Sequence, residues 1–203
     1  MLLPQKAIWE ADKKCLIIAD LHLGKIEHFR ASGIGLPQKA VNATLEKLKC
    51  LLNTFEPQHV IFLGDLFHSR KNDSFKKLSS ILKEFENTLF TLITGNHDIL
   101  TNDDYTDLGL SVYPELVLGN LWLTHEPQKE LKGHNYNLAG HIHPGVRLNG
   151  KGKQSISLPC FYFGDTAGIL PAFGYFTGKA ILKPDRNSKV FVIAEDLIYN
   201  VSL

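Results

Sequence analysis

Three uninterrupted runs of apolar residues in the first half of the chain each end on a group of polar residues. The runs cover residues 15–20, 59–65 and 89–95. Apolar runs of this length are typical of strands whose two faces are both covered within an α/β sheet. We therefore predict three buried strands in the N-terminal half.

The segments between these runs carry apolar residues at helical spacing. In residues 36–55 the apolar stripe consists of Val41, Leu45, Leu48 and Leu52. The next stripe consists of Phe75, Leu78, Leu82 and Phe85, and Asp73 or Ser74 can cap its start. The order strand, helix, strand, helix, strand predicts two successive βαβ units and a parallel sheet.

After residue 98 the pattern changes to short strand candidates separated by glycine, asparagine or proline. The candidates are residues 116–118, 121–125, 136–141, 155–163, 179–182 and 190–194. No third long helical stripe follows, so the second half is predicted to be mostly sheet. Because no repeat or linker interrupts the 203 residues, we expect a single domain over residues 1–203.

Composition and charge exclude few classes of protein. Hydrophobic residues make up 44% and charged residues 21%, and the net charge is +1, so only a local patch can attract nucleic acid. The three cysteines form no C-x-x-C pair, which favours buried thiols in a reducing compartment. No signal-peptide pattern or membrane-length apolar run occurs, so we expect a cytoplasmic protein without a membrane partner.

Five polar groups follow apolar runs and carry the candidate chemistry. They are Asp20-Leu21-His22, Gly64-Asp65, Gly95-Asn96-His97-Asp98, Thr124-His125 and Gly140-His141-Ile142-His143. The carboxyl ends of parallel strands share one edge of a sheet, so we expect the groups to converge there. In extended chain, residues two apart point the same way, which predicts that each D-x-H or H-x-H pair faces one site.

The converging groups contain two carboxylates, four imidazoles and one side-chain amide. Nitrogen and hard oxygen donors without thiolate favour Mn²⁺, Fe or Zn²⁺ over Ca²⁺. Seven donors exceed the three that one catalytic ion usually keeps, so they suit two ions bridged by a carboxylate. On its own, each of these groups is more often part of a surface loop or contains a histidine whose ring is already hydrogen-bonded. Five such groups in this order indicate a metal site. We expect two divalent ions per chain, with Mn²⁺ first and Fe or Zn²⁺ as alternatives.

These ordered motifs resemble those of the calcineurin-like metallophosphoesterase superfamily. The resemblance implies an α/β fold, a four-layer α/β/β/α sandwich. It also implies that the first ion is held by Asp20, His22 and His143. The second ion would be held by Asn96, His125 and His141, with Asp65 bridging the two.

The same resemblance implies the chemistry around the ions. A metal-bridging hydroxide would attack phosphorus, His97 would contact the phosphate or protonate the leaving oxygen, and Asp98 would orient His97. One departure stands out, because His125 is followed by Glu126-Pro127, where many relatives continue with glycine. Substrate rules borrowed from the broad superfamily are therefore not transferred to this chain.

The motifs Asp20-Leu21-His22-Leu23-Gly24-Lys25 and Gly64-Asp65-Leu66-Phe67-His68-Ser69 are similar to those of a bacterial group within the superfamily. These are the ligase-associated DNA damage response endonucleases of the PdeM group. The resemblance implies hydrolysis of phosphodiester bonds in nucleic acid or a nucleotide-like compound during DNA repair. DNA-repair proteins are then expected partners, and self-association is compatible with the sequence.

Basic residues near the last motif agree with a phosphate-rich substrate. Residues 129–153 contain one acid, Glu130, and five bases, Lys129, Lys132, Arg147, Lys151 and Lys153. We expect them to rim the metal site, although a solvated loop face explains them equally well. The predicted substrate contacts are Asn96, His97, His68 and Arg147, and Arg70 and Lys71 are further candidates.

Two other functions are compatible with the sequence. The first is a phosphomonoesterase acting on a small metabolite or a phosphoprotein. The second is a non-catalytic interaction module on the same fold, which the complete set of predicted ligands disfavours. Comparing hydrolysis of a monoester with that of a diester separates the two enzymatic hypotheses. Activity on any phosphoester that is lost in His97→Ala would exclude the interaction module.

Overall fold

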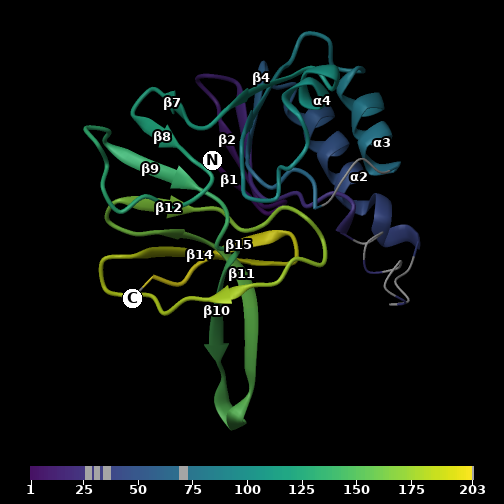
Figure 1. Cartoon of the computed structure of the whole chain (residues 1–203). Helices are drawn as coiled ribbons and strands as arrows, with labels where there is room; N and C mark the ends of the chain where they lie inside the picture. The colour runs from purple at the N-terminus through teal and green to yellow at the C-terminus, as the bar shows by residue number, and fades with distance from the viewer. Residues whose placement is uncertain (26–28, 30–32, 34–37, 69–72, 203) are drawn as a thin grey trace.

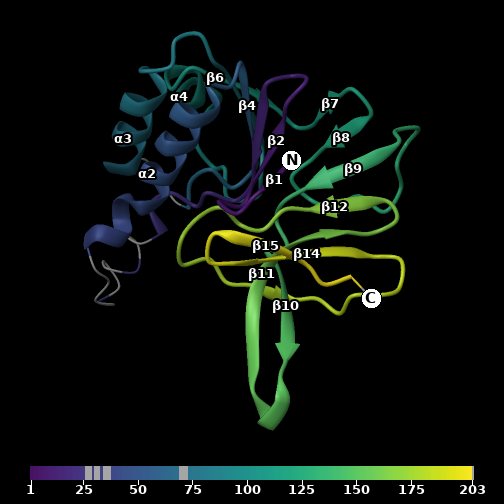
Figure 2. The same ribbon diagram turned by 180° about the vertical axis from the view of Figure 1, so that it is seen from behind.

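The computed structural model describes residues 1–25, 29, 33, 38–68 and 73–202. It contains two sheets, one built mainly from the first half of the chain and one from the second half (Figure 1). The helices lie beside the first sheet, whereas the second half consists mainly of strands and loops (Figure 2). Arg70 and Lys71, which the sequence analysis named, lie outside the described residues.

The first sheet has six strands in the order of the sequence. They are β1 Leu2–Leu3, β2 Ala7–Glu10, β3 Cys15–Ile18, β4 His59–Leu63, β5 Leu89–Ile93 and β6 Leu110–Tyr113. Strands β3 to β6 are parallel, and β1 and β2 are antiparallel additions at the edge. The two βαβ units are confirmed. Strands β1, β2 and β6 were not among the strands predicted from the sequence.

In the described part of the chain, two long helices and one short helix accompany this sheet. They are α2 Gln38–Phe55, α3 Asp73–Leu82 and α4 Asn102–Asp107. The buried residues of the predicted stripes are Leu45, Leu48, Leu52, Leu78 and Leu82. They join one core cluster with residues of β3 and β4 such as Leu16 and Phe62, so α2 and α3 cover one face of the sheet.

The second sheet follows the order β13-β10-β11-β12-β9-β8-β7, with β14 paired to β11 and β15 paired to β14. Its strands are β7 Leu116–Leu118, β8 Leu121–Leu123, β9 Tyr136–Ala139, β10 Pro144–Asn149, β11 Ser155–Phe163, β12 Ala167–Ile169, β13 Ala180–Ile181, β14 Lys189–Ala194 and β15 Leu197–Asn200. Strands β10, β12 and β15 were not predicted. Strands β8 and β9 end two residues before the predicted ends, so His125 and His141 lie in loops.

The core between the two sheets contains the remaining face of β3 and β4. Ile17 and Ile61 pack there with Leu123, Leu138 and Phe161 of the second sheet. Because alternate residues of β3 enter the helix-facing and sheet-facing cores, this strand is apolar throughout. The α/β class and the sandwich of two sheets are confirmed. In the described residues after position 107, the helical structure is the short turn η1, Lys151–Lys153.

Two expectations drawn from composition have direct counterparts in the described residues. Cys15 and Cys160 are buried free thiols, as expected, whereas Cys50 is exposed on α2. None of the described helices has both the length and the apolar character that crossing a membrane requires.

Candidate metal centre

The polar groups predicted to converge do so at the carboxyl ends of strands from both sheets. Asp20 and His22 follow β3, Asp65 follows β4, and Asn96 follows β5. From the second sheet, His125 follows β8, and His141 and His143 follow β9. Every predicted ligand is therefore delivered by the end of a buried strand.

The first group of donors consists of Asp20, His22 and His143. Each offers one ligand atom, and these atoms lie within 4.8 Å of one another. The Nε2 atom of His143 lies 3.2 Å from Nε2 of His22 and 3.5 Å from Oδ1 of Asp20. The Asp20 carboxylate also accepts the backbone N–H of His141, at 2.9 Å to Oδ2, which couples the β3 and β9 loops.

The second group consists of Asp65, His125 and His141, whose ligand atoms also lie within 4.8 Å of one another. Nε2 of His125 lies 3.1 Å from Nδ1 of His141 and 3.5 Å from Oδ1 of Asp65. The amide oxygen of Asn96 is 3.0 Å from the same His125 Nε2. Asn96 therefore lies beside the second group.

The Asp65 carboxylate, a member of the second group, also reaches the first group. Its Oδ2 is 3.6 Å from Nε2 of His22, and its Oδ1 is 3.5 Å from Nε2 of His125. The backbone N–H of His97 donates to Oδ1 at 2.9 Å, which fixes the orientation of this buried side chain. One carboxylate thus presents one oxygen to each group.

The donor set fits two cations. Nδ1 of His125 is 2.9 Å from the carbonyl oxygen of Leu63, so Nδ1 carries the proton and Nε2 is a bare lone pair when the ring is neutral. That lone pair faces the oxygens of Asn96 and Asp65, an arrangement of acceptors that a cation stabilises. Burial and the neighbouring His143 lower the pKa of His22 to about 2, which keeps this ring neutral and able to bind metal.

The backbone at the ligands differs from the extended chain expected from the i, i+2 spacing. Positive φ angles occur at Asp20 (55°), His22 (47°), Asp65 (51°), His141 (66°) and His143 (52°). The two side chains of each D-x-H or H-x-H pair do face one site. They are turned toward it by left-handed backbone and not by a continued strand. Such backbone costs about 1–2 kcal/mol per non-glycine residue, so the surrounding packing holds the site in a strained conformation.

Gly64 lies where the site leaves no room for a side chain. Its φ is +78°, and a Cβ at this position would overlap the ring of His125. At Gly140 a Cβ would lie 2.6 Å from Oδ2 of Asp20. Glycine at these positions lets two strand ends approach the ligands closely.

Replacing Gly64 with alanine is expected to destabilise the metal-free protein by about 2–5 kcal/mol and to weaken metal binding through His125. The cost combines the left-handed backbone with overpacking against the ring. Urea unfolding in EDTA and metal content after dialysis measure the two effects. Gly133→Ala is the matched control, because Gly133 has a φ of +88° but an added Cβ there would meet no atom within 4 Å. Equal losses in both variants would contradict the crowding argument.

His97 and His68 lie beside the first group. Their rings stack with centroids 5.3 Å apart, and the His97 ring centroid is 5.4 Å from that of His22. The His68 ring is 5.8 Å from His22. Two imidazoles outside the seven candidate ligands therefore line the same side of the site.

The Asp98 carboxylate accepts hydrogen bonds from backbone N–H groups of two loops. Its Oδ2 accepts the backbone N–H groups of Asp65 at 2.8 Å and Gly95 at 2.9 Å, and its Oδ1 accepts that of Leu66 at 2.9 Å. Burial raises the pKa of the Asp98 carboxyl. The side chain joins the loops after β4 and β5, so its contribution is to hold the backbone on both sides of Asp65.

The sequence profile of the family described as calcineurin-like phosphoesterase matches residues 13–159. The chain belongs to the calcineurin-like phosphoesterases. This match spans every candidate ligand, and members of the family typically bind two divalent metal ions. A search of curated proteins gave no match.

Solved structures resemble this calcineurin-like phosphoesterase to different degrees. The nuclease MPE from Pseudomonas putida has 32% sequence identity and a TM-score of 0.81, covering 98% of this chain and 93% of the nuclease chain. The phosphoesterase Yfce from E. coli has 16% identity and a TM-score of 0.47, covering 93% and 92%. A protein of unknown function, AQ665 from Aquifex aeolicus, has 16% identity and a TM-score of 0.46, covering 68% and 82%.

The basic residues of this calcineurin-like phosphoesterase do not all rim the metal centre. Lys132 does, because it lines a cavity of about 400 Å³ together with Asn96 and His125. Arg147 lies on β10 and is exposed, and Lys151 and Lys153 lie in η1 at the end of the β10–β11 hairpin. The expectation that the basic residues rim the metal site was therefore wrong for Lys151 and Lys153, because strand β10 leads away from His143 to η1.

The cavity beside Asn96 and His125 also places residues that the sequence analysis left without a role. Glu126, the departure from the family pattern, lines it, and so do Glu115 and Trp122. A carboxylate beside the second donor group disfavours a further phosphate there. The signal for Glu126 was its position next to His125, whereas nothing in the sequence indicated Glu115.

The metal-free phosphoesterase is expected to lose stability on acidification below pH 6.5. The His22 pKa falls from 6.5 to about 2 on folding, so between these values the unfolded chain binds a proton that the folded chain does not. One such proton corresponds to about 1.4 kcal/mol per pH unit. Urea unfolding in EDTA at pH 7, 6 and 5 measures the free energy of unfolding. This free energy should depend less on pH in His22→Asn than in the wild type. The same pH dependence in the wild type and in His22→Asn would contradict the burial of a neutral His22.

Proposed function

We propose that this chain is a dinuclear metal-dependent phosphodiesterase that cleaves nucleic acid, with DNA as its substrate and DNA repair as its setting. The observation that carries the proposal is the Asp65 carboxylate, with one oxygen 3.6 Å from His22 and the other 3.5 Å from His125. Two donor groups joined by one carboxylate suit chemistry at a phosphoryl centre.

In this proposal each donor group holds one ion. Asp20, His22 and His143 bind the first ion, Asn96, His125 and His141 bind the second, and Asp65 binds both. The ions, Mn²⁺ in the first instance and Fe or Zn²⁺ as alternatives, supply Lewis-acid polarisation of the phosphoryl group and activation of water. The protein contributes neutral imidazoles, because burial keeps the His22 pKa far below its ordinary value.

Residues outside the ligand set position the phosphodiester. His97 and His68 stand next to His22 with stacked rings, where they can donate to phosphate oxygens. We assign to a ring N–H of His97 the proton transfer to the leaving oxygen, since an alkoxide leaves poorly without a proton. Asn96, itself one of the proposed ligands, would contact both the second ion and the phosphate. Asp98 acts by holding the backbone N–H groups of Asp65 and Gly95.

Nucleic acid is the proposed substrate for two reasons. The chain is 32% identical over 98% of its length to a protein described as a nuclease. Its motifs after β3 and β4 also resemble those of DNA damage response endonucleases. Arg147 remains a proposed phosphate contact, although it lies on β10 rather than at the ligands.

The direct test is hydrolysis by the purified chain with added Mn²⁺. We expect turnover of bis(p-nitrophenyl) phosphate, little turnover of p-nitrophenyl phosphate, cleavage of a 5′-labelled oligonucleotide, and loss of all activity in EDTA. Preference for the monoester would support a phosphomonoesterase instead. No hydrolysis of either ester with Mn²⁺, Fe²⁺ or Zn²⁺ would favour a non-catalytic interaction module.

A further inference from the structure

The β10–β11 hairpin extends beyond the rest of the second sheet. At its base, Gly145 pairs with Ile181 of β13 and Cys160 pairs with Val192 of β14. Between these points, residues 146–158 pair only with each other among the described strands, from Val146–Leu158 to Asn149–Ser155. Figures 1 and 2 show this hairpin protruding from the body of the molecule. We refer to residues 146–158 as the arm.

The arm has a charge unlike that of the whole chain. It contains Arg147, Lys151 and Lys153, all exposed, and no aspartate or glutamate. The entire chain of 203 residues has a net charge of +1. A charge of +3 is thus concentrated on a narrow projection.

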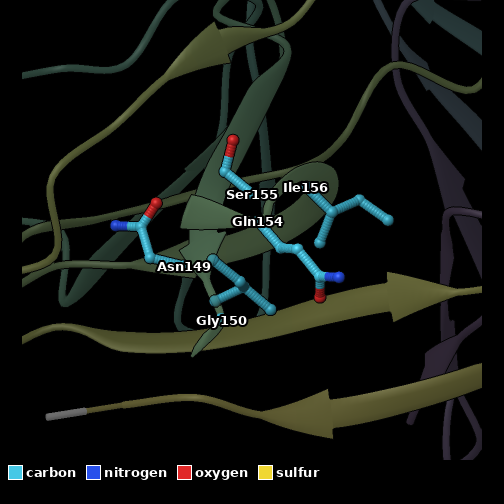
Figure 3. A pocket seen from close by; sticks show the side chains of 6 residues that line it. Asn149, Gly150, Gln154, Ser155 and Ile156 are labelled. Atoms are coloured by element: carbon cyan, nitrogen blue, oxygen red, sulfur yellow. The ribbon is translucent and has the colours of Figure 1, made fainter. Parts of the chain in front are cut away.

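The two faces of the arm differ in polarity. Directly opposed residues of an antiparallel pair share a face, so Arg147 lies with Ser157, and Asn149 with Ser155. The other face carries the pair Leu148 and Ile156. Asn149, Gln154 and Ser155 line a hollow of about 410 Å³ near the tip, and Figure 3 shows their side chains projecting in different directions. Amides and a hydroxyl there can donate and accept hydrogen bonds beside the lysines.

The arm starts at the metal centre. Strand β10 begins at Pro144, the residue after the proposed ligand His143. At about 3.4 Å per residue, the six residues of β10 place the tip roughly 20 Å from its start. In duplex DNA this distance corresponds to about six base pairs.

We propose that the arm binds the duplex that flanks the cleaved strand, with Lys151 and Lys153 on its phosphates. A two-stranded β-ribbon fits the major groove, which is about 12 Å wide. An arm with three basic residues and no acidic residue matches a polyanion, and the polar tip matches base edges and phosphates. Pairing with the arm of a second copy would bring two +3 segments together, which disfavours it. The proposal rests on the proposed nuclease function and names the substrate geometry that this function would use.

The test uses the full chain, the variant K151Q/K153Q, and labelled oligonucleotides with one single-stranded tail and a duplex part of 2, 4, 6, 8 or 12 base pairs. Fluorescence anisotropy in EDTA measures binding without cleavage. Wild-type affinity should rise once the duplex reaches about six base pairs, and the variant should lack this rise. For the variant, the slope of log K against log salt concentration should be smaller in magnitude by about two. Each lost phosphate contact lowers the magnitude of this slope by about 0.9.

Matched controls separate the arm from general charge. The variant K13Q/K76Q removes two exposed lysines outside the arm and should bind as the wild type does. Turnover of bis(p-nitrophenyl) phosphate should be unchanged in K151Q/K153Q. Failure of hydrolysis in both proteins would count against the proposed function, not against the arm.

Three results would overturn the proposal. One is wild-type affinity that does not depend on duplex length. Another is a loss of affinity in K151Q/K153Q that is as large for a single strand of the same length as for the oligonucleotide with a duplex part. That result would make the arm a general strand-binding surface. The last is a change of oligomeric state in K151Q/K153Q measured by light scattering, which would assign the arm to self-association.

Discussion

Replacing Asp65 with asparagine is expected to lower kcat/KM for phosphodiester hydrolysis about 1000-fold or more. The carboxylate presents one oxygen to each donor cluster, with Oδ2 3.6 Å from His22 and Oδ1 3.5 Å from His125. A two-metal site contributes several kcal/mol to transition-state stabilisation, and about 1.4 kcal/mol corresponds to a factor of ten. Steady-state turnover of bis(p-nitrophenyl) phosphate with Mn²⁺ measures the loss.

Asparagine is the informative substitution because it preserves the fold. Asp65 has a φ of 51°, a conformation that asparagine tolerates, and Oδ1 still accepts the His97 N–H. Melting temperature in EDTA should therefore be close to that of the wild type, while stabilisation by Mn²⁺ should be lost. Asp107→Asn, at an exposed acid on α4, is the matched control. Full activity in Asp65→Asn would refute the bridging role.

The second large effect is expected in His97→Ala, and it depends on the substrate. Cleavage of DNA should fall by about 10²–10⁴, the usual contribution of a general acid. Turnover of bis(p-nitrophenyl) phosphate should stay within about tenfold, because nitrophenolate leaves without a proton. A gel assay of oligonucleotide cleavage and the colorimetric assay, run on one preparation, measure the two rates.

His134→Ala is the matched control for His97, because His134 contacts Trp122, with ring centroids 4.9 Å apart, and is not one of the proposed catalytic or ligand residues. We expect it to keep both activities. Equal losses on DNA and on bis(p-nitrophenyl) phosphate in His97→Ala would show that His97 supports the metal centre rather than protonating the leaving group. His68→Ala should reduce DNA cleavage less, since its ring is farther from His22, at 5.8 Å against 5.4 Å for His97.

The ends of the buried strands could be predicted because both faces of β3 and β4 are covered. Leu16 enters the core beneath the helices, and Ile17 enters the core between the sheets. Because every residue of such a strand enters one core or the other, the apolar run ends near the end of the strand. The polar residues that follow are the candidate ligands. Short edge strands such as β1 Leu2–Leu3 have too few residues to produce such a pattern.

The local conformation of the ligands could not be predicted from the sequence. Spacing of two residues indicates extended chain, but Asp20 and His22 have φ angles of 55° and 47°. Non-glycine residues adopt such angles only when tertiary packing holds them, and the residue type alone does not indicate this. For the same reason the partners of Asp98 were missed, since they are backbone N–H groups of other loops.

The position of the basic residues also depends on tertiary structure. Lys151 is eight residues after His143, and closeness in sequence suggested closeness in space. Strand β10, Pro144–Asn149, instead continues away from the ligands, and each of its residues adds about 3.4 Å. Lys132 is at the site because its loop returns to the cavity beside Asn96.

Metal stoichiometry tests the dinuclear centre most directly. The chain is freed of metal with EDTA, titrated with Mn²⁺ by calorimetry, and analysed for bound manganese by mass spectrometry after dialysis. Two ions per wild-type chain are predicted, with at most one per chain in Asp65→Asn. A single ion per wild-type chain at saturation, or two undiminished ions in Asp65→Asn, would contradict a centre bridged by Asp65.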